Sequence, residues 1–200
     1  MILELDVNKE NIKECVKAVL SKIIFHGLEE EVIVRNSKHE FIMCFEKGFK
    51  KYIDFENYNI KNLNLGCGKL KFDDAIGIDI EDYGQELVWD LREGIPFPDE
   101  TIQNIKAHHF LEHIERGKVI FVWQEMYRIL VSEGILDIVV PHSTSYYAFI
   151  PIHLSYWNEG VIDFLCNGNY INTRFKVIEM ERFTHNKEGD ITLKCQLKKV

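Results

Sequence analysis

Residues 63–80 read "LNLGCGKLKFDDAIGIDI". Two apolar runs typical of buried strands flank a Gly-Cys-Gly turn at residues 66–68, and the second run ends on an acid, Asp79. Glycines allow a ligand to approach the backbone closely. A carboxylate in the place of Asp79 can accept hydrogen bonds from both hydroxyls of a ribose. The stretch therefore predicts a strand, a ligand-binding turn and a second strand.

Two familiar glycine motifs do not fit this turn. A P-loop needs G-x-x-x-x-G-K-[ST], but Leu70 follows Gly68-Lys69 and Leu63 stands where the first glycine should be. A dinucleotide fingerprint needs a third glycine three residues after the second, and that position is Lys71. The sequence therefore argues against phosphate-loop and NAD binding.

From residue 62 onward, the sequence alternates between strand-like and helix-like patterns. An apolar stripe at helical spacing predicts a helix over residues 117–131, and the continuous apolar run "ILDIVVP" (135–141) predicts a strand buried on both faces. The tail holds two β-runs joined by "HNKEGD", which predicts an antiparallel hairpin. This alternation is typical of an α/β domain with a mainly parallel sheet. Further strands are predicted at "LNL", "AIGIDI", "ELVWDL" and "NIKAHHF".

Residues 1–60 have a different pattern. Apolar spacing predicts an amphipathic helix over residues 8–25, and "EVIVRN" and "HEFIMCFEKGF" predict a hairpin or two edge strands. We therefore divide the chain into a helix-and-strand appendage (1–60) and an α/β domain (61–200).

Composition narrows the range of partners. The chain has 200 residues, with 24 Lys+Arg against 32 Asp+Glu and a formal net charge of −8, so it has no overall basic field to hold a nucleic acid. The sequence contains no signal-peptide pattern and no apolar segment of the roughly 18 residues that a membrane span requires. We expect a cytoplasmic protein.

Cysteine and histidine spacing predicts no metal site. The five cysteines are scattered without a C-x-x-C pair, which is typical of reduced, buried thiols. The eight histidines include no H-E-x-x-H, and the closest cluster is His108, His109 and His113. For Glu112 and His113, starting and bracing a helix is favoured over a part in the chemistry.

The ordered series "LNLGCG", "GIDI", "VWDLREGIPFPDETI", "AHHFLEHI" and "EMYRILVSEGILDIVVP", with the closing hairpin, resembles class I S-adenosylmethionine-dependent methyltransferases. The resemblance covers residues 62–200, and it is greatest with the compact bacterial type that has Leu-Glu-His after the fourth strand. It implies a Rossmann-like fold, S-adenosyl-L-methionine as cofactor and methyl transfer as the reaction.

The resemblance also implies a role for each matching residue. The backbone of Leu65, Gly66, Cys67 and Gly68 would pass under the methionine part of the cofactor, and a side chain at either glycine would collide with it. Asp79 would hold the ribose hydroxyls and Ile80 would pack on the adenine. Asp90 and the backbone of Leu91 would receive the adenine amino group, and His109 would lie beside the methyl group.

The chain also departs from the family pattern. Leu70 replaces a third glycine, and the short interval from Gly66 to Asp79 predicts that a loop replaces the first crossover helix. Gln103 stands where an acid is usual before the fourth strand. His142 follows Pro141 where an acid is common, so the mouth of the active site differs from that of relatives.

Three histidines are candidate bases for deprotonating an acceptor: His109, His142 and His153. His109 and His142 rank first because both follow predicted strands, and open α/β sheets place ligands at the carboxyl ends of their strands. A structural histidine is the competing interpretation for each.

Residues 141–158, "PHSTSYYAFIPIHLSYWN", contain five aromatic rings and no Asp, Glu, Lys or Arg. Such a segment can form a substrate lid with aromatic walls. An ordinary helix packed on the sheet, or a homodimer contact, would together explain it nearly as well.

These patterns favour a methyltransferase that acts on O or N of a small-molecule or glycan-type acceptor. Two alternatives stay open: an RNA methyltransferase, and a protein that binds S-adenosylmethionine without catalysis. The base-methylating motif of an Asp or Asn before Pro-Pro and an aromatic is missing, since that place reads "AHHF".

Overall fold

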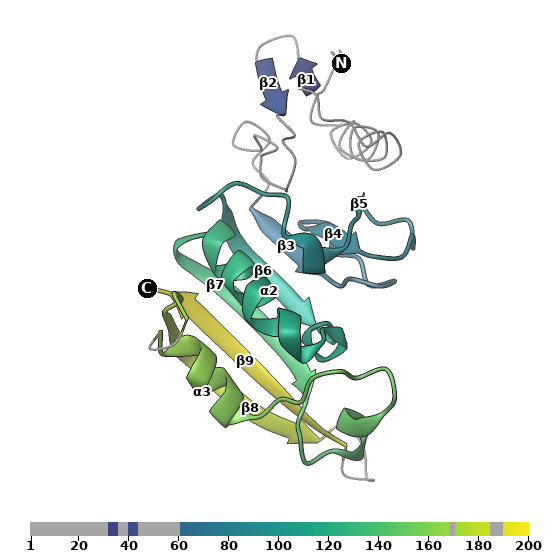
Figure 1. Ribbon diagram of the computed structural model, residues 1–200, viewed down its shortest axis with the longest axis vertical. Coiled ribbons are helices and arrows are strands. Elements are labelled where there is room, and N and C mark those ends of the chain that lie inside the picture. The colour runs from purple at the N-terminus through teal and green to yellow at the C-terminus, as the bar shows by residue number, and fades with distance from the viewer. Residues whose placement is uncertain (1–31, 36–39, 44–60, 169–170, 185–189) are drawn as a thin grey trace.

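The computed structural model describes residues 32–35, 40–43, 61–168, 171–184 and 190–200. Its main feature is a seven-stranded sheet in the order β5-β4-β3-β6-β7-β9-β8 (Figure 1). The strands from β5 to β7 pair in parallel, and β9 pairs antiparallel with both β7 and β8. This arrangement confirms the predicted Rossmann-like sheet with a closing hairpin. The strands are β3 (Asn62–Leu65), β4 (Ile76–Asp79), β5 (Leu87–Val88), β6 (Ile102–His108), β7 (Leu130–Pro141), β8 (Phe175–Thr184) and β9 (Ile191–Lys199).

Two helices, α2 (Arg116–Ile129) and α3 (Glu159–Cys166), pack on one face of this sheet (Figure 1). The apolar stripe of α2 is buried at Val122, Trp123, Met126 and Ile129, as its helical spacing predicts. Helix α3 begins where the Asn158 side chain accepts a hydrogen bond from the backbone of Val161. The core therefore lies between these helices and one side of the strands.

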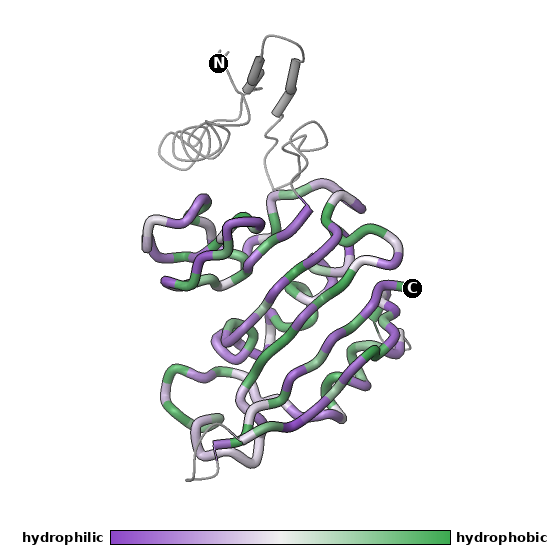
Figure 2. The backbone as a smooth tube through the Cα atoms, turned by 180° about the vertical axis from the view of Figure 1, so that it is seen from behind, coloured by the Kyte–Doolittle hydropathy of each residue, from purple (hydrophilic) through white to green (hydrophobic). Residues whose placement is uncertain are grey.

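Figure 2 shows the other face of the sheet, with no described helix over it. On β7, fully buried Leu136, Ile138 and Val140 alternate with half-buried Asp137 and Val139. The prediction that 135–141 is buried on both faces is therefore wrong. Its residues are nearly all apolar, but the described helices cover only one side of the strand.

The chain reverses direction across the sheet between β3 and β6. From β3 it continues to β4 and β5 on one side, and β6 then pairs with the opposite side of β3. Open α/β sheets bind ligands at the carboxyl ends of the strands at such a switch point. The Gly-Cys-Gly turn follows β3, and His109 follows β6.

Residues 66–75, which connect β3 to β4, form turns and no helix, as the short interval predicts. The Asn64 side chain donates to the carbonyl of Leu70 at 2.9 Å, and Leu70 N donates to the carbonyl of Cys67 at 2.9 Å. These bonds hold the loop close to the end of β3.

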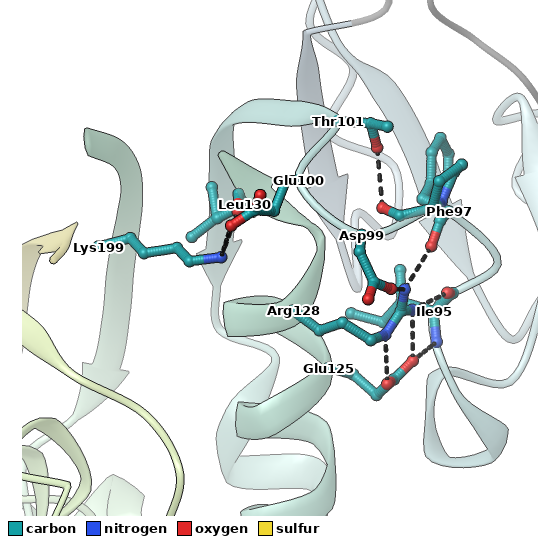
Figure 3. A network of polar contacts seen from close by, with 10 residues as sticks. Ile95, Phe97, Asp99, Glu100, Thr101, Glu125, Arg128, Leu130 and Lys199 are labelled. Atoms are coloured by element: carbon teal, nitrogen blue, oxygen red, sulfur yellow. Dashed lines mark hydrogen bonds and ion pairs between the residues drawn. The ribbon is translucent and has the colours of Figure 1, made fainter. Parts of the chain in front are cut away.

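The predicted strand 86–91 is shorter in the structure, because β5 covers only Leu87–Val88. Asp90 instead caps the 3-10 turn η2 (Leu91–Glu93). Arg128 of α2 anchors the segment after η2 (Figure 3): it donates to both carboxylate oxygens of Glu125, to Asp99, and to the carbonyls of Ile95 and Phe97.

Before residue 61 the structure describes only β1 (Val32–Arg35) and β2 (Glu40–Met43), which pair antiparallel with each other. This pairing agrees with the predicted hairpin. The predicted helix over 8–25 lies outside the described residues, and the division at residue 60 stays a prediction. Within the described segments, no helix has both the length and the apolar character to cross a membrane.

Candidate functional site

The turn after β3 adopts a backbone that suits glycine. Gly66 has φ +60° and Gly68 has φ +51°, both in the left-handed region. A Cβ atom placed on Gly68 would have no described atom within 4 Å, so this position faces open space. A ligand could therefore lie directly against the backbone at Gly68.

Gly66 is required for a different reason from the one that the resemblance implies. A Cβ atom there would lie 2.4 Å from Cδ2 of Phe110, which follows β6. Gly66 therefore lets Phe110 pack on the turn. Because Phe110 is the residue after His109, this packing also joins the ends of β3 and β6.

Asp79, at the end of β4, reaches the same turn. Its Oδ2 accepts a hydrogen bond from Gly68 N at 2.8 Å, and its Oδ1 accepts one from Glu81 N at 3.1 Å. A carboxylate has about four lone-pair positions, so it can accept further bonds from a ligand. Next to it, the side chain of Ile80 is 54% exposed, as an apolar surface that receives a flat base would be.

Asp90 already has a strong partner in the structure. Arg92 donates to it from Nε at 2.9 Å and from Nη2 at 2.8 Å, and these bonds hold the pKa of Asp90 below its ordinary value. The side chain of Leu91, the next residue, is buried. An adenine amino group would therefore share the Asp90 carboxylate with Arg92.

Cys67 contributes its backbone to the turn and keeps its side chain inside. Its thiol is buried, and burial raises its pKa to about 11. Cys166 and Cys195 are also buried and unbridged, and the remaining two cysteines lie outside the described residues. These three thiols are inert at neutral pH.

A cavity of about 290 Å³ opens beside His109, where the ends of β6, β7 and the β8–β9 hairpin meet. The loop after β7 forms its other wall through Tyr147, Ile150 and His153. This part of the 141–158 segment therefore lines a cavity, and it does not form the ordinary helix that was the alternative. Only the short 3-10 turn η4 (Tyr146–Phe149) and the start of α3 are helical between residues 141 and 160. The lining residues are His109, Pro141, Tyr147, Ile150, His153, Asp190 and Thr192.

His109 has an unusual backbone and a buried partner. Its φ is +52°, a strained value for a residue with a side chain, and strained backbone clusters at functional sites. Its Nδ1 lies 3.2 Å from Oε1 of Glu112, a side chain that is 2% exposed. The hydrogen bond to Glu112 raises the pKa of His109 above its ordinary value.

His142 does not line this cavity. Its side chain is 2% exposed, and both ring nitrogens have partners: Nδ1 lies 2.7 Å from Thr144 Oγ1, and Nε2 lies 3.2 Å from Glu159 Oε2. This geometry favours a structural role for His142 over that of a base.

His153 lines the cavity, and burial lowers its pKa below the ordinary value. His153 lies near Glu112 and His113, for which the sequence pattern favours a helix start. Both belong to the 3-10 turn η3 (Leu111–His113). One donor atom from each of the three side chains lies within 4.8 Å of the others. The sequence gives no signal of this cluster, because His153 is 40 residues away from His113.

Comparisons with known proteins support the fold. No protein-family model and no curated protein sequence matches the chain. A SAM-dependent methyltransferase from Archaeoglobus fulgidus has a similar structure: it is 18% identical, 94% of each chain is covered, and the TM-score is 0.55. The chain has the fold of SAM-dependent methyltransferases.

Two further solved structures of this fold have different activities. The 1,6-didemethyltoxoflavin-N1-methyltransferase of Burkholderia thailandensis, with bound 1,6-didemethyltoxoflavin and S-adenosylhomocysteine, is 13% identical, with 73% of this chain and 74% of that chain covered and a TM-score of 0.54. The [4+2]-cyclase SpnF is also 13% identical, with 70% and 74% covered and a TM-score of 0.53. The fold therefore occurs with more than one reaction.

Proposed function

We propose that this protein is an S-adenosylmethionine-dependent methyltransferase that acts on O or N of a small-molecule or glycan-type acceptor. The observation that carries the proposal is the turn at Gly68, which faces open space beside the Asp79 carboxylate at the switch point of the sheet. Phe110 packs on that turn, and the preceding residue, His109, lines the neighbouring cavity. A cofactor on the turn and an acceptor in the cavity would meet at the end of β6.

The described residues fit the proposed cofactor. Gly68 leaves room for its methionine part, Asp79 offers acceptors for its ribose hydroxyls, and the exposed side chain of Ile80 offers a surface for its adenine. When bound, S-adenosylmethionine supplies an electrophilic methyl group on a sulfonium and a good leaving group. The protein then has to align the acceptor and take up its proton where necessary.

His109 is the residue that we assign to this proton. A neutral His109 that donates from Nδ1–H to Glu112 keeps the lone pair of Nε2 for the acceptor. Glu112 is buried, so it fixes the ring orientation and stabilises the charged imidazolium that forms. Glu112 acts here as a positioning residue.

The cavity favours a small acceptor. Its volume of about 290 Å³ is close to the lower end of small-molecule sites. Tyr147 and Ile150 offer apolar contact, and Asp190 and Thr192 offer polar contact. The lining includes no lysine or arginine, the side chains that hold an RNA backbone. This composition argues for a small-molecule or glycan-type acceptor over RNA.

The experiment is methyl transfer from methyl-labelled S-adenosylmethionine by the full chain to separate pools of small metabolites, glycans and RNA. We expect labelled product from the metabolite or glycan pool, and at least a tenfold loss with His109→Gln, the order of magnitude of general-base catalysis. Label in RNA alone would overturn the acceptor assignment. Cofactor binding without labelled product in any pool would favour the non-catalytic alternative.

A further inference from the structure

The cluster of Glu112, His113 and His153 has the composition of a metal site. Two of these side chains come from η3 after β6 and the third from the loop after β7, and one donor atom of each lies within 4.8 Å of the others. The rings of His113 and His153 meet edge to face, with centroids 4.9 Å apart. Two imidazoles and a carboxylate thus converge beside the cavity.

The carboxylate of Glu112 is only half satisfied. Its side chain is 2% exposed; Oε1 bonds to His109, and Oε2 is buried with no hydrogen-bond partner in the part of the chain that the structure describes. A buried acceptor without a partner costs free energy, and a carboxylate costs more than a neutral group. An ion at Oε2 would remove this cost.

The two histidines leave ring nitrogens for such an ion. Nδ1 of His113 lies 3.1 Å from the carbonyl of Ile152, so it must be protonated and donate, which leaves the Nε2 lone pair. Metal-bound histidines commonly donate their other N–H to a carbonyl in this way. Nδ1 of His153 is buried and has no hydrogen-bond partner among the described residues.

Backbone bonds hold the two halves of the cluster together. The carbonyl of Glu112 accepts from Leu154 N at 2.7 Å and from Ser155 N at 3.1 Å, and Ser155 Oγ donates to the carbonyl of Leu111 at 2.8 Å. The loop that carries His153 is therefore fixed to the turn that carries Glu112 and His113. These bonds keep the three side chains on neighbouring, fixed stretches of backbone.

We propose that Glu112, His113 and His153 bind one divalent transition-metal ion of the zinc type. Two imidazoles with one carboxylate suit zinc and its neighbours, whereas magnesium and calcium prefer oxygen ligands alone. Three protein ligands leave a coordination position open. Because His153 also lines the cavity, the ion would lie beside the space proposed for the acceptor, and an oxygen or nitrogen of the acceptor could serve as its fourth ligand.

Metal binding is tested on the full chain after removal of ions with a chelator. We expect about one equivalent of Zn²⁺ after dialysis, by elemental analysis, with an affinity that His113→Gln and His153→Gln each reduce at least tenfold. The matched control is His108→Gln, since His108 pairs with Asp137 on the neighbouring strand and lies outside the cluster. Excess Mg²⁺ should not displace Zn²⁺.

A measurement on the unmodified chain tests the proposal even where the variants fail to fold. X-ray absorption of the Zn²⁺-loaded protein should show two imidazole ligands with further light-atom ligands. Absence of Zn²⁺ binding, binding that both variants retain, or a spectrum without imidazole would overturn the proposal. Only the role of the open position rests on the proposed methyl transfer. If the proposed function is wrong, S-adenosylhomocysteine binding and labelled product will be absent. Both are measured separately from Zn²⁺ binding.

Discussion

Replacement of Asp79 by alanine tests the proposed ribose contact. The carboxylate accepts from Gly68 N and Glu81 N, and we propose that it also accepts from the ribose hydroxyls. A hydrogen bond to a charged group contributes about 1.5 to 3 kcal/mol. Asp79→Ala should therefore weaken S-adenosylhomocysteine binding about 10- to 150-fold, since each 1.4 kcal/mol is a factor of ten.

The same substitution should have a smaller effect on folding. The backbone N–H groups of Gly68 and Glu81 lie near the surface, where water can replace the lost acceptor, so we expect a loss of about 0.5 to 1 kcal/mol in the free energy of unfolding. Calorimetric titration gives the affinity, and urea unfolding gives the stability. The matched control is Asp73→Ala, an exposed acid in the same loop. A folded Asp79→Ala protein with unchanged affinity, or an equal loss in the control, would refute the ribose contact.

Four further substitutions test the packing and the ion pairs of the fold. Gly66→Val should cost about 2 to 4 kcal/mol in the free energy of unfolding, because its Cβ meets Phe110 at a left-handed φ, and Phe110→Ala should recover part of the loss in urea unfolding. Arg128→Met should cost about 3 kcal/mol by the same measurement, since Glu125 and two backbone carbonyls lose their donor. The hydrogen bond from Arg182 lowers the pKa of Glu159 from 4.5 to about 2, so the ionised Glu159 stabilises the fold above pH 4.5 and this contribution is lost as the pH falls towards 2. With solvent screening taken into account, Glu159→Gln should therefore lower the free energy of unfolding by about 1 to 2 kcal/mol at pH 7. In urea unfolding below pH 4.5, the difference between Glu159→Gln and the unmodified chain should become smaller. A difference that stays constant with pH would contradict this role of the ionised Glu159.

The sequence predicts the individual strands and the main helix well because their signals are local. Short apolar runs mark β3, β4 and β6, and the helical stripe marks α2. The short interval between Gly66 and Asp79 also predicts the loop that replaces a helix. The two-sided burial of 135–141 is wrong because it depends on which elements cover the sheet, and a strand's own residues do not report that.

Features of the site that depend on long-range contacts could not be predicted. His142 follows a strand as a ligand-binding residue would, but its pairing with Glu159 becomes visible only when α3 is in place. The proximity of His153 to Glu112 and His113 depends on the docking of a loop through backbone bonds to Glu112. Neither spacing nor residue type reports such bonds.

The most direct test of the proposed cofactor site is titration of the full chain with S-adenosylhomocysteine. NAD is titrated separately as the comparison ligand, and Gly68→Asn is measured beside the unmodified protein. Asparagine tolerates the left-handed backbone, and its side chain would enter the open space at Gly68. The control is Gly84→Asn, at another left-handed glycine, of φ +79°. We predict that S-adenosylhomocysteine binds to the unmodified chain and NAD does not, with at least a tenfold loss in Gly68→Asn alone. Absence of S-adenosylhomocysteine binding, or equal affinity in Gly68→Asn, would rule out the proposed cofactor site at this turn.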